Sequence, residues 1–332
     1  MAVPSSQMSL PLPLGDDRIS SKSIAAGCRV RWSYSRRGVF EQCLRRYFYE
    51  YYALKAAATL PVGVREQLVL LKKLQNRHER AGNIAHLVIA VYLRKAQTGD
   101  LWQPGRLAAW AKTLFEQDLA YSSQYRGGPF EHRGKIEPIL LQEYFYQDPD
   151  RQRFFEETLQ KLLDGLRAFV ESSEFEEFRL AGVRPGALVE RNVIFKVQER
   201  SGYGKVDLAF ESEDRATVVD WKLGEAGGTG EESLQLGAYA LWAVDAFHVP
   251  TELLRICKAH LQGCRIVDFA VTTSVLASVR ARIRQDLERM ELMDKYGRQG
   301  ESEAFTPCAK PNVCRLCPYR AICPEGRATL NA

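Results

Sequence analysis

The chain has 332 residues, of which 45% are hydrophobic and 26% are charged. This composition is typical of a soluble globular protein and excludes disordered and collagen-like chains. The formal net charge of +5 is compatible with a polyanionic partner but does not identify one. The length fits one large domain, or a core that carries a helical insertion.

The compartment follows from the first residues and the cysteines. No apolar run reaches the length of about 18 residues that would span a membrane, and residues 1–17 hold three prolines and no Lys or Arg, unlike a secretory signal. We therefore expect a cytoplasmic protein without a membrane partner. Eight cysteines in a reducing compartment are poor candidates for disulfides, so a tight cysteine cluster would favour metal binding.

The first half of the chain is predicted to be helical. Residues 1–30 lack periodicity and begin with a Ser- and Pro-rich stretch, which predicts a flexible tail. Helical spacing then predicts an all-helical region over residues 31–180, with breaks near Gly127 and between Gln147 and Asp150. The helical runs within it are Ser35–Ala58, Arg65–Arg94 and Leu101–Phe178.

The pattern changes after residue 180, where β-rich runs are separated by short polar links. The first three runs predict an antiparallel meander, and two more strands lie between two helices. Residues 181–300 thus predict an α/β core with a mixed sheet flanked by helices, followed by a cysteine-rich tail over residues 301–332. The predicted strands are Leu188–Gln198, Lys205–Glu211, Ala216–Leu223, Leu253–Leu261 and Arg265–Val271, and the helices are Glu232–Phe247 and Val275–Met293.

Asp220 and Lys222 lie two residues apart on a predicted strand, where side chains at this spacing share one face. Val219 and Trp221 would then point into the core. A carboxylate holds a hard cation through oxygen, while an ammonium stabilises charge on a phosphate or orients the attacking water. The pair alone is a weak signal, because exposed salt bridges on strands are common.

Neighbouring polar residues strengthen this signal. Asp207 adds a second acid on the preceding strand, and Gln235 and Tyr239 project from one face of the next helix at i, i+4. Upstream, His86 lies on a predicted helix four residues after Gly82, although a single histidine on a helix is more often structural than a ligand. The combination, rather than any one residue, predicts a metal-dependent phosphodiesterase site.

The series Gly204-x-x-Asp207, Asp220-x-Lys222 and Gln235-x-x-x-Tyr239 resembles the motifs of the RecB-like PD-(D/E)XK nucleases, and Gly82-x-x-x-His86 matches their histidine motif. The resemblance implies a restriction-endonuclease-like core over residues 181–300. It also implies the roles of the site residues: catalysis by Asp207, Asp220, Lys222, Gln235 and Tyr239, and binding of Mg²⁺ or Mn²⁺ by His86, Asp207, Asp220 and the backbone carbonyl of Trp221. Glu190, on the first strand of the meander, is either an acid that supports the ligands or ordinary surface charge.

The tail contains Cys314, Cys317 and Cys323 in C-x2-C-x5-C spacing, a density that favours a bound metal. The residues alone leave the fourth ligand open among Cys308, Cys43 and Cys28. Cys308 would complete a local zinc-like knot, whereas Cys43 would join the two ends of the chain. Cys257 and Cys264 fall in predicted strands and are expected in the core.

The segment around Cys43 is similar to the N-terminal cysteine motif of RecB-like nucleases that hold a 4Fe-4S cluster, with Leu44 in place of the usual proline. That group includes the CRISPR-associated exonuclease and the nuclease domain of AddB. The resemblance implies that Cys43, Cys314, Cys317 and Cys323 hold a 4Fe-4S cluster and bring the tail back onto the N-terminal helix. Zinc remains the alternative metal.

The residues Arg45, Arg46, Tyr47, Tyr49, Tyr51 and Tyr52 alternate cations and rings. Such a pattern could stack bases of single-stranded DNA, but rings on a helix more often pack into the core, and we favour packing. No phosphate-binding Gly-x4-Gly-Lys-Ser/Thr loop is present in the sequence, so the chain is not itself a helicase.

The expected function is a metal-dependent DNA nuclease, either an exonuclease or one that prefers single strands, in DNA repair, recombination or defence. DNA with a free end is the expected substrate, and a separate helicase or a recombination or CRISPR protein is the expected partner. Two alternatives stay open: a non-catalytic DNA- or protein-binding scaffold with an iron-sulfur or zinc site, and a zinc-stabilised interaction protein in which the Asp220-x-Lys222 spacing is accidental.

Overall fold

The computed structural model describes residues 30–56, 62–128, 136–212, 215–225 and 232–330. Nearly all of the predicted flexible tail, and Cys28 with it, lie outside these residues. None of the helices in the described ranges combines the length and the apolar character that crossing a membrane requires.

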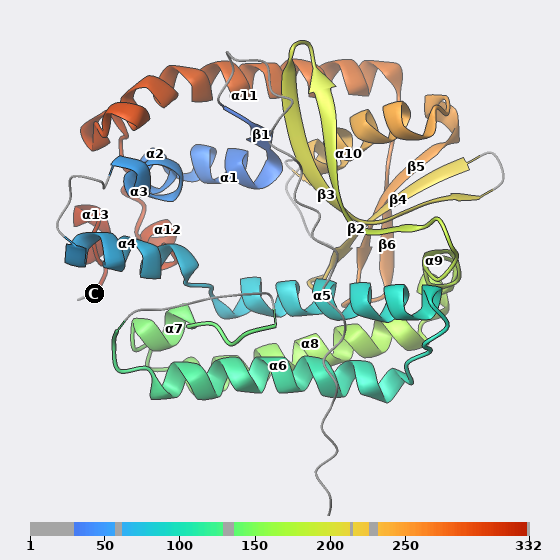
Figure 1. Cartoon of the computed structure of the whole chain (residues 1–332), viewed down its shortest axis with the longest axis horizontal. Coiled ribbons are helices and arrows are strands. Elements are labelled where there is room, and N and C mark those ends of the chain that lie inside the picture. The colour runs from blue at the N-terminus through green and yellow to red at the C-terminus, as the bar shows by residue number, and fades with distance from the viewer. Residues whose placement is uncertain (1–29, 57–61, 129–135, 213–214, 226–231, 331–332) are drawn as a thin grey trace, which may run out of the picture.

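A mixed sheet organises the fold (Figure 1). Its strand order is β1-β3-β4-β5-β6, with β2 also paired to β3. The predicted antiparallel meander is confirmed, since β2 and β4 both run antiparallel to β3. β5 then lies parallel to β4, and β6 returns antiparallel to β5. The strands are β1 (Trp32–Ser33), β2 (Leu188–Val197), β3 (Arg200–Ser212), β4 (Arg215–Lys222), β5 (Leu254–His260) and β6 (Arg265–Phe269).

The short strand β1 corrects the prediction that the first half of the chain is all helical. Trp32 and Ser33 lie parallel to β3 beside Gly202 and Tyr203, although 170 residues separate them in the sequence. Trp32 is fully buried, and its indole N–H donates to Asp286 Oδ2 at 3.1 Å. A two-residue strand is too short to show the alternation on which strand prediction depends, so tertiary contacts alone define it.

Helices cover both faces of the sheet (Figure 1). On one face α10 packs against β2, β3, β4 and β5, with α11 behind it, and on the other face α5 and α9 contact β2 and β3. The helices are α1 (Tyr34–Gln42), α2 (Leu44–Phe48), α3 (Leu54–Ala56), α4 (Val62–Lys73), α5 (Arg77–Gln97), α6 (Pro104–Gln124), α7 (Gln142–Phe145), α8 (Arg151–Glu171), α9 (Glu176–Gly182), α10 (Glu232–Phe247), α11 (Thr273–Gln299), α12 (Pro311–Arg315) and α13 (Pro324–Arg327), with a π-helical turn at Tyr49–Ala53 and 3-10 turns at Ser173–Phe175, Thr251–Leu253 and Ser302–Ala304.

The strand β4 divides two hydrophobic cores. Val218 joins the core beneath α10 and α11, whereas Val219 and Trp221 join the core beneath α5, α8 and α9. The prediction that Val219 and Trp221 point inward is therefore confirmed. Because side chains alternate along a strand, Asp220 and Lys222 are directed to the face that carries α10.

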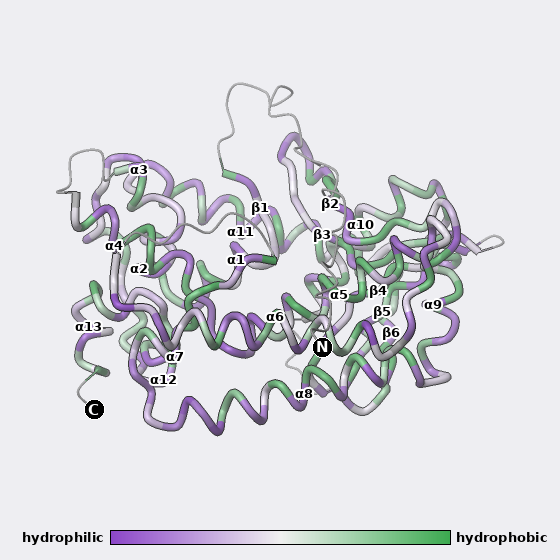
Figure 2. The backbone as a smooth tube through the Cα atoms, turned by 60° about the horizontal axis from the view of Figure 1, so that its bottom comes forward, coloured by the Kyte–Doolittle hydropathy of each residue, from purple (hydrophilic) through white to green (hydrophobic). Residues whose placement is uncertain are grey.

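The helices α5, α6 and α8 build the second core. On α8 the buried residues recur at helical spacing, as Phe155, Leu162, Leu166 and Phe169 show, and the helix alternates hydrophobic and hydrophilic stretches along its length (Figure 2). This stripe packs into the same cluster as Trp221 of the sheet. The helical region therefore supplies one of the two layers that bury the sheet.

The helix α11 begins and ends with recognisable caps. Thr272 accepts a hydrogen bond from the Val275 backbone N–H at the first turn, and Gly300 ends the helix in the left-handed conformation, with φ 77°. Glycine adopts this conformation without steric cost, which makes it the usual residue after a helix end. The helix extends six residues beyond the predicted end at Met293 and passes through Gly297 before it ends.

Gly202 in β3 is a sensitive position in the first core. A Cβ atom added there would lie 2.1 Å from the ring of Phe195, which is itself buried against Trp32. We expect Gly202→Ala to destabilise the protein by about 1–3 kcal/mol, the usual cost of overpacking. Gly38→Ala on exposed α1 meets no atom within 4 Å and should stabilise by about 0.5–1 kcal/mol. Thermal unfolding of both variants checks this, and equal shifts would contradict it.

Candidate active site

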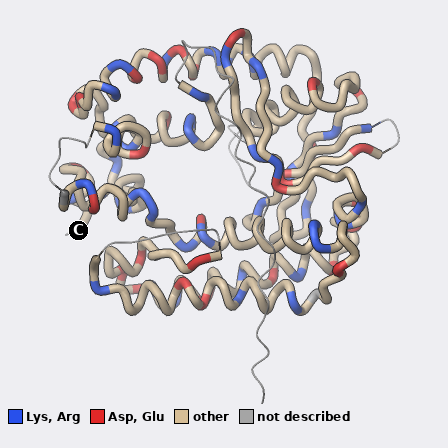
Figure 3. The backbone as a smooth tube through the Cα atoms, in the orientation of Figure 1, with Lys and Arg blue, Asp and Glu red and all other residues tan. Residues whose placement is uncertain are grey.

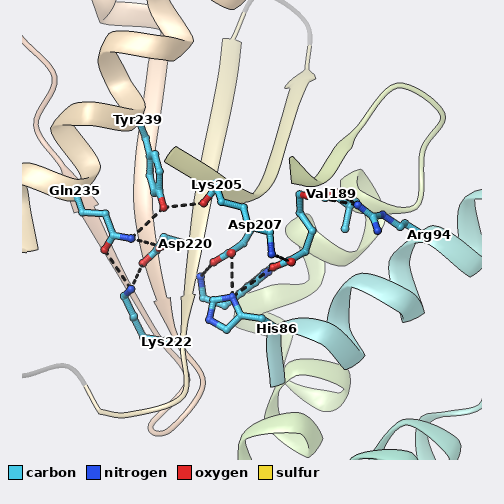
Figure 4. A network of polar contacts seen from close by, with 11 residues as sticks. His86, Arg94, Val189, Lys205, Asp207, Asp220, Lys222, Gln235 and Tyr239 are labelled. Carbon is cyan, nitrogen blue, oxygen red and sulfur yellow. Dashed lines mark hydrogen bonds and ion pairs between the residues drawn. The ribbon is translucent and has the colours of Figure 1, made fainter. Parts of the chain in front are cut away.

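Two acids and a lysine from neighbouring strands meet on the α10 face of the sheet (Figure 4). Asp207 comes from β3, and Asp220 and Lys222 come from the end of β4. Asp220 is 2% exposed, and its Oδ2 lies 2.7 Å from Lys222 Nζ. The predicted placement of Asp220 and Lys222 on one face is confirmed, and both acids are buried, where a charge needs a cation or hydrogen-bond donors as partners.

Gln235 and Tyr239 of α10 link these groups. Gln235 donates to Asp220 Oδ1 at 3.1 Å and to Tyr239 Oη at 3.0 Å, and its Oε1 accepts from Lys222 Nζ at 3.2 Å. Tyr239 in turn donates to the Lys205 backbone carbonyl at 2.8 Å. Burial, together with the charges of Asp220 and Asp207, raises the pKa of Tyr239 well above its ordinary value, so the phenol remains a donor.

Gly204 has a packing role that explains the glycine of the sequence motif. A Cβ atom at this position would lie 3.1 Å from the ring of Tyr239 and 3.2 Å from Val193. The missing side chain lets Tyr239 approach β3 closely enough to reach the carbonyl of Lys205. Gly82 differs, because an added Cβ would meet no atom within 4 Å.

His86 enters the site from α5, a helix of the other layer (Figure 4). Its Nδ1 lies 2.9 Å from Asp207 Oδ1 and 3.7 Å from Glu190 Oε1. Burial favours the neutral ring, but the Asp207 carboxylate outweighs this effect and raises the pKa of His86. The histidine predicted from the Gly82-x-x-x-His86 motif is therefore in contact with the acid predicted from β3.

Glu190 is closer to the centre of the site than the sequence indicated. One ligand atom each from His86, Glu190 and Asp207 lie within 4.8 Å of one another, and no other group of three or more His, Cys, Asp and Glu in the described part of the chain is as compact. Glu190 is 8% exposed and also forms an ion pair with Lys205. Figure 3 shows acidic and basic positions side by side on the strands of the sheet. For Glu190, which the sequence left open between a supporting acid and surface charge, the position favours the supporting acid. Lys205 is a site residue to which the sequence assigned no role.

The arrangement separates the metal ligands expected from the sequence into two parts. Asp207 shares the compact group with His86, whereas Asp220 is held by Lys222 and Gln235. The two parts are joined through the backbone, because the Trp221 N–H donates to Asp207 Oδ2 at 2.8 Å. Asp207 thus offers one oxygen to each part.

The site opens into a cavity of about 840 Å³. The sheet lines it with Tyr203, Lys205 and the site acids, and α10, the first turns of α5 and the start of α1 form the rest of the lining. Tyr34 and His78 are among the lining residues. The volume is that of a pocket which encloses a small ligand, and cations, acids and rings all face it.

A second cluster lies at the ends of the chain, where α1–α4 lie beside α12 and α13 (Figure 1). The five cysteines of this region line one small cavity: Cys43, Cys308, Cys314, Cys317 and Cys323. The Cys308 backbone N–H donates to Cys43 Sγ at 3.4 Å. Burial raises the pKa of Cys317 to about 11, so binding a metal would release protons. Cys257 is fully buried in the second core, as expected. The expectation for Cys264 was wrong, because this residue lies half-buried in the turn between β5 and β6.

Cys43 lies at a break between helices rather than inside the predicted run Ser35–Ala58. Its backbone is extended, with φ −165° and ψ 115°, between the end of α1 and the start of α2. Nearby, the Tyr319 hydroxyl of the tail donates to Glu50 Oε2 at 2.6 Å. The Tyr146 hydroxyl, next to α7, donates to the Pro318 carbonyl at 2.6 Å. The tail is therefore held by both the N-terminal helices and the helical region.

The aromatic run after Cys43 packs inward, as favoured from the sequence. Tyr47 and Tyr52 are buried, and Tyr49 lies against Tyr319 with ring centroids 5.3 Å apart. Arg45 donates to the Phe305 carbonyl at 2.9 Å. These residues hold the tail in place, so few of their rings are available to stack on DNA bases.

The chain belongs to the PD-(D/E)XK nuclease superfamily, whose family model matches residues 31–324. The members of this superfamily are nucleases, which places the activity among phosphodiester hydrolases. The mixed sheet flanked by helices agrees with this core fold.

Other comparisons add little. No curated protein matches the chain. A solved structure described as "Crystal structure of SSO0001" is 12% identical and covers 65% of this chain and 96% of its own, with a TM-score of 0.27. A TM-score this low carries no argument about function.

Proposed function

We propose that this protein is a RecB-like, Mg²⁺- or Mn²⁺-dependent deoxyribonuclease that acts on single strands, from their ends. The observation that carries the proposal is the meeting of His86, Asp207, Asp220 and Lys222 in one cavity. These residues come from α5, β3 and β4, elements that only the folded chain brings together.

The residues present fit a divalent cation. Carboxylate oxygens and an imidazole suit Mg²⁺ and Mn²⁺, and Asp220 Oδ2 is a buried oxygen that makes no hydrogen bond of good geometry in the described structure, although Lys222 lies beside it. His86, Asp207, Asp220 and the Trp221 carbonyl would hold the ion. A bound ion would stabilise charge on the phosphate and lower the pKa of a bound water.

The remaining polar groups orient Lys222. Asp220 and Gln235 both contact its ammonium, which faces the cavity and can stabilise negative charge on a phosphate oxygen as the bond breaks. Tyr239 keeps Gln235 in place and remains protonated because its pKa is raised. The Lys222 ammonium, the Asp220 carboxylate and the Gln235 amide therefore form one pre-organised network.

The preference for single strands rests on the shape of the cavity. Its volume of about 840 Å³ accommodates a small ligand, and walls from α5 and from the start of α1 oppose the sheet. In this proposal an unpaired strand enters between these walls with its bases beside Tyr34 and Tyr203, since aromatic rings stack on bases of any sequence.

An assay on end-labelled DNA tests the proposal. Single-stranded and double-stranded substrates carrying a label at either end are incubated with the protein, with and without Mn²⁺. We expect metal-dependent shortening of single strands. Equal cutting inside blunt duplexes would contradict the strand preference, and no cutting by the metal-loaded protein would contradict the function.

His86→Ala is expected to raise the Mn²⁺ concentration needed for half-maximal cleavage by about 10-fold or more, as loss of one metal ligand or its support commonly does. High Mn²⁺ should restore activity in part, because the acids remain. His78→Ala is the matched control, since His78 is on the same helix and lines the same cavity. A lower melting temperature without a changed Mn²⁺ dependence would favour a purely structural histidine.

We further propose that Cys43, Cys314, Cys317 and Cys323 hold a 4Fe-4S cluster. Four thiolates about 2.3 Å from a single zinc ion would lie roughly 3.8 Å apart. In the described residues no three of the cysteine sulfurs lie within 4.8 Å of one another, although all line one cavity. This wider spacing favours a group with several metal atoms over one zinc ion.

Cys308 has a different role in this proposal. Its backbone N–H donates to Cys43 Sγ, and hydrogen bonds to cluster sulfurs tune the reduction potential. Cys308 then contributes through its amide, which any residue except proline can supply. We also propose that the nuclease serves DNA repair, recombination or defence. Its proposed partner is a separate helicase or a recombination or CRISPR protein.

A further inference from the structure

Glu190 has an unusual backbone conformation. Its φ is 51°, in the left-handed region that glycine adopts freely and that costs energy for a residue with a side chain. The strand register pairs Val189 with Leu208 and Arg191 with Val206, but does not include Glu190, which falls between them opposite Asp207. The ladder between β2 and β3 is therefore interrupted at the two acids.

This interruption directs Glu190 into the site. Two carboxylates directly opposite each other in a regular antiparallel pair would repel. With its altered backbone, Glu190 instead places one oxygen 3.7 Å from His86 Nδ1 and the other beside the ammonium of Lys205. A glycine would relieve the strain at this position but would supply no carboxylate.

Arg94 holds the interrupted segment. It projects from α5, two turns beyond His86, and its Nη2 donates to the Val189 carbonyl at 2.6 Å and reaches the Glu190 carbonyl at 3.5 Å (Figure 4). The guanidinium thus donates to the carbonyls of Val189 and Glu190, which lie on either side of the strained Glu190 Cα atom. His86 and Arg94 are on the same helix, so one rigid element positions both the imidazole and the bend that presents Glu190.

We infer that Arg94 is a positioning residue for the cation site: it fixes the bend of β2 that places the Glu190 carboxylate with His86 and Asp207, which makes Glu190 a further metal ligand. This inference rests on the proposed metal-dependent function. It assigns roles to two residues outside the motif series, one as ligand and one as its support.

The test measures Mn²⁺ affinity by electron paramagnetic resonance of the free ion, without reference to cleavage. Arg94→Ala is expected to weaken Mn²⁺ binding by about 10-fold, as loss of a residue that orients a ligand does. Arg94→Lys should restore part of the affinity, because an ammonium can still donate to a carbonyl. In a Glu190→Gln background, Arg94→Ala should have no further effect, because residues that act through one ligand are not additive.

Gln97→Ala is the matched control. Gln97 also projects from α5 and donates to the backbone carbonyls of Gly182 and Ala187, at 2.8 and 3.2 Å. It fastens α5 to the segment just before β2 but does not contact Glu190 in the described structure. Its loss should lower the melting temperature and leave Mn²⁺ affinity at the wild-type value.

The outcomes are distinguishable. Wild-type Mn²⁺ affinity in folded Arg94→Ala protein would overturn the role of Arg94 and leave the metal site standing. The same would follow if Arg94→Ala weakened binding equally in the wild-type and Glu190→Gln backgrounds. Failure of the wild-type protein to bind Mn²⁺ would overturn the proposed metal site and the inference together. If Arg94→Ala does not fold, the affinity of Arg94→Lys, compared with that of Gln97→Ala, decides the question.

Discussion

Replacing Lys222 by alanine is expected to lower the rate of DNA cleavage by about 10²–10³-fold, the usual effect of removing one group that stabilises charge in the transition state. The ammonium faces the cavity and is held by Asp220 and Gln235. Because it acts on the transition state more than on bound DNA, kcat should fall while DNA affinity changes little.

Asp220→Ala should cause a similar loss for a different reason. It removes a buried acid that the proposal assigns to the metal, and it also removes the partner that orients Lys222. Lys196→Ala and Asp268→Ala are matched controls, because these exposed residues lie on β2 and β6 with surface partners. Cleavage kinetics and DNA binding of the four variants are compared with Mn²⁺. Wild-type cleavage by either site variant would refute the assigned active site.

Cys43→Ser is expected to produce the largest loss of stability and to remove the cluster. Cys43 and Cys308 lie 265 positions apart in sequence yet are in contact, so a group bound by Cys43 and the tail closes nearly the whole chain into a loop. Opening such a loop of roughly 270 residues corresponds to about 5–6 kcal/mol of chain entropy. Cys308→Ser should be nearly silent, because the backbone N–H that contacts Cys43 remains and the serine hydroxyl can replace the thiol beside Cys43 and Cys314.

Metal analysis and thermal unfolding of both variants distinguish the two ligand sets. Iron and sulfide that persist in Cys43→Ser but are absent from Cys308→Ser would overturn the assignment, since that pattern requires a local knot within the tail. Zinc in place of iron in the wild-type protein would overturn the cluster type. Absorbance near 400 nm, as Fe–S centres show, should disappear only from Cys43→Ser.

Local patterns in the sequence account for much of the fold. The boundaries of α10 were predicted to the residue, and the order and antiparallel pairing of β2, β3 and β4 were predicted as well. The first connection was misplaced, because β3 begins at Arg200, five residues before the predicted start at Lys205. Because side chains alternate between the two faces of a strand, the sequence also predicted that Asp220 and Lys222 of β4 share one face and Val219 and Trp221 the other. These features depend on neighbouring residues, so periodicity and turn residues contain the information needed.

Other features depend on residues that are distant in sequence. β1 is defined by its contacts with β3 and α11, and the break at Cys43 separates two helices without a proline to mark it. At Glu190, a left-handed backbone opposes the propensity of the residue, and Arg94 stabilises it from another element. Local propensity has no access to such tertiary effects, so the sequence indicated the acids but not how Glu190 reaches them.

The meeting of the two chain ends affects how the protein is made. Chains fold from the N-terminus during synthesis, but Cys43 contacts a segment that the ribosome produces 265 residues later. Tyr319, also from that segment, is the partner of Glu50. α1 and α2 must therefore wait for the tail with a thiol and several apolar rings uncovered. The proposed cysteine-bound metal could bind only after both segments had been made, so in a cell short of that metal we expect this corner to be the first exposed to proteases.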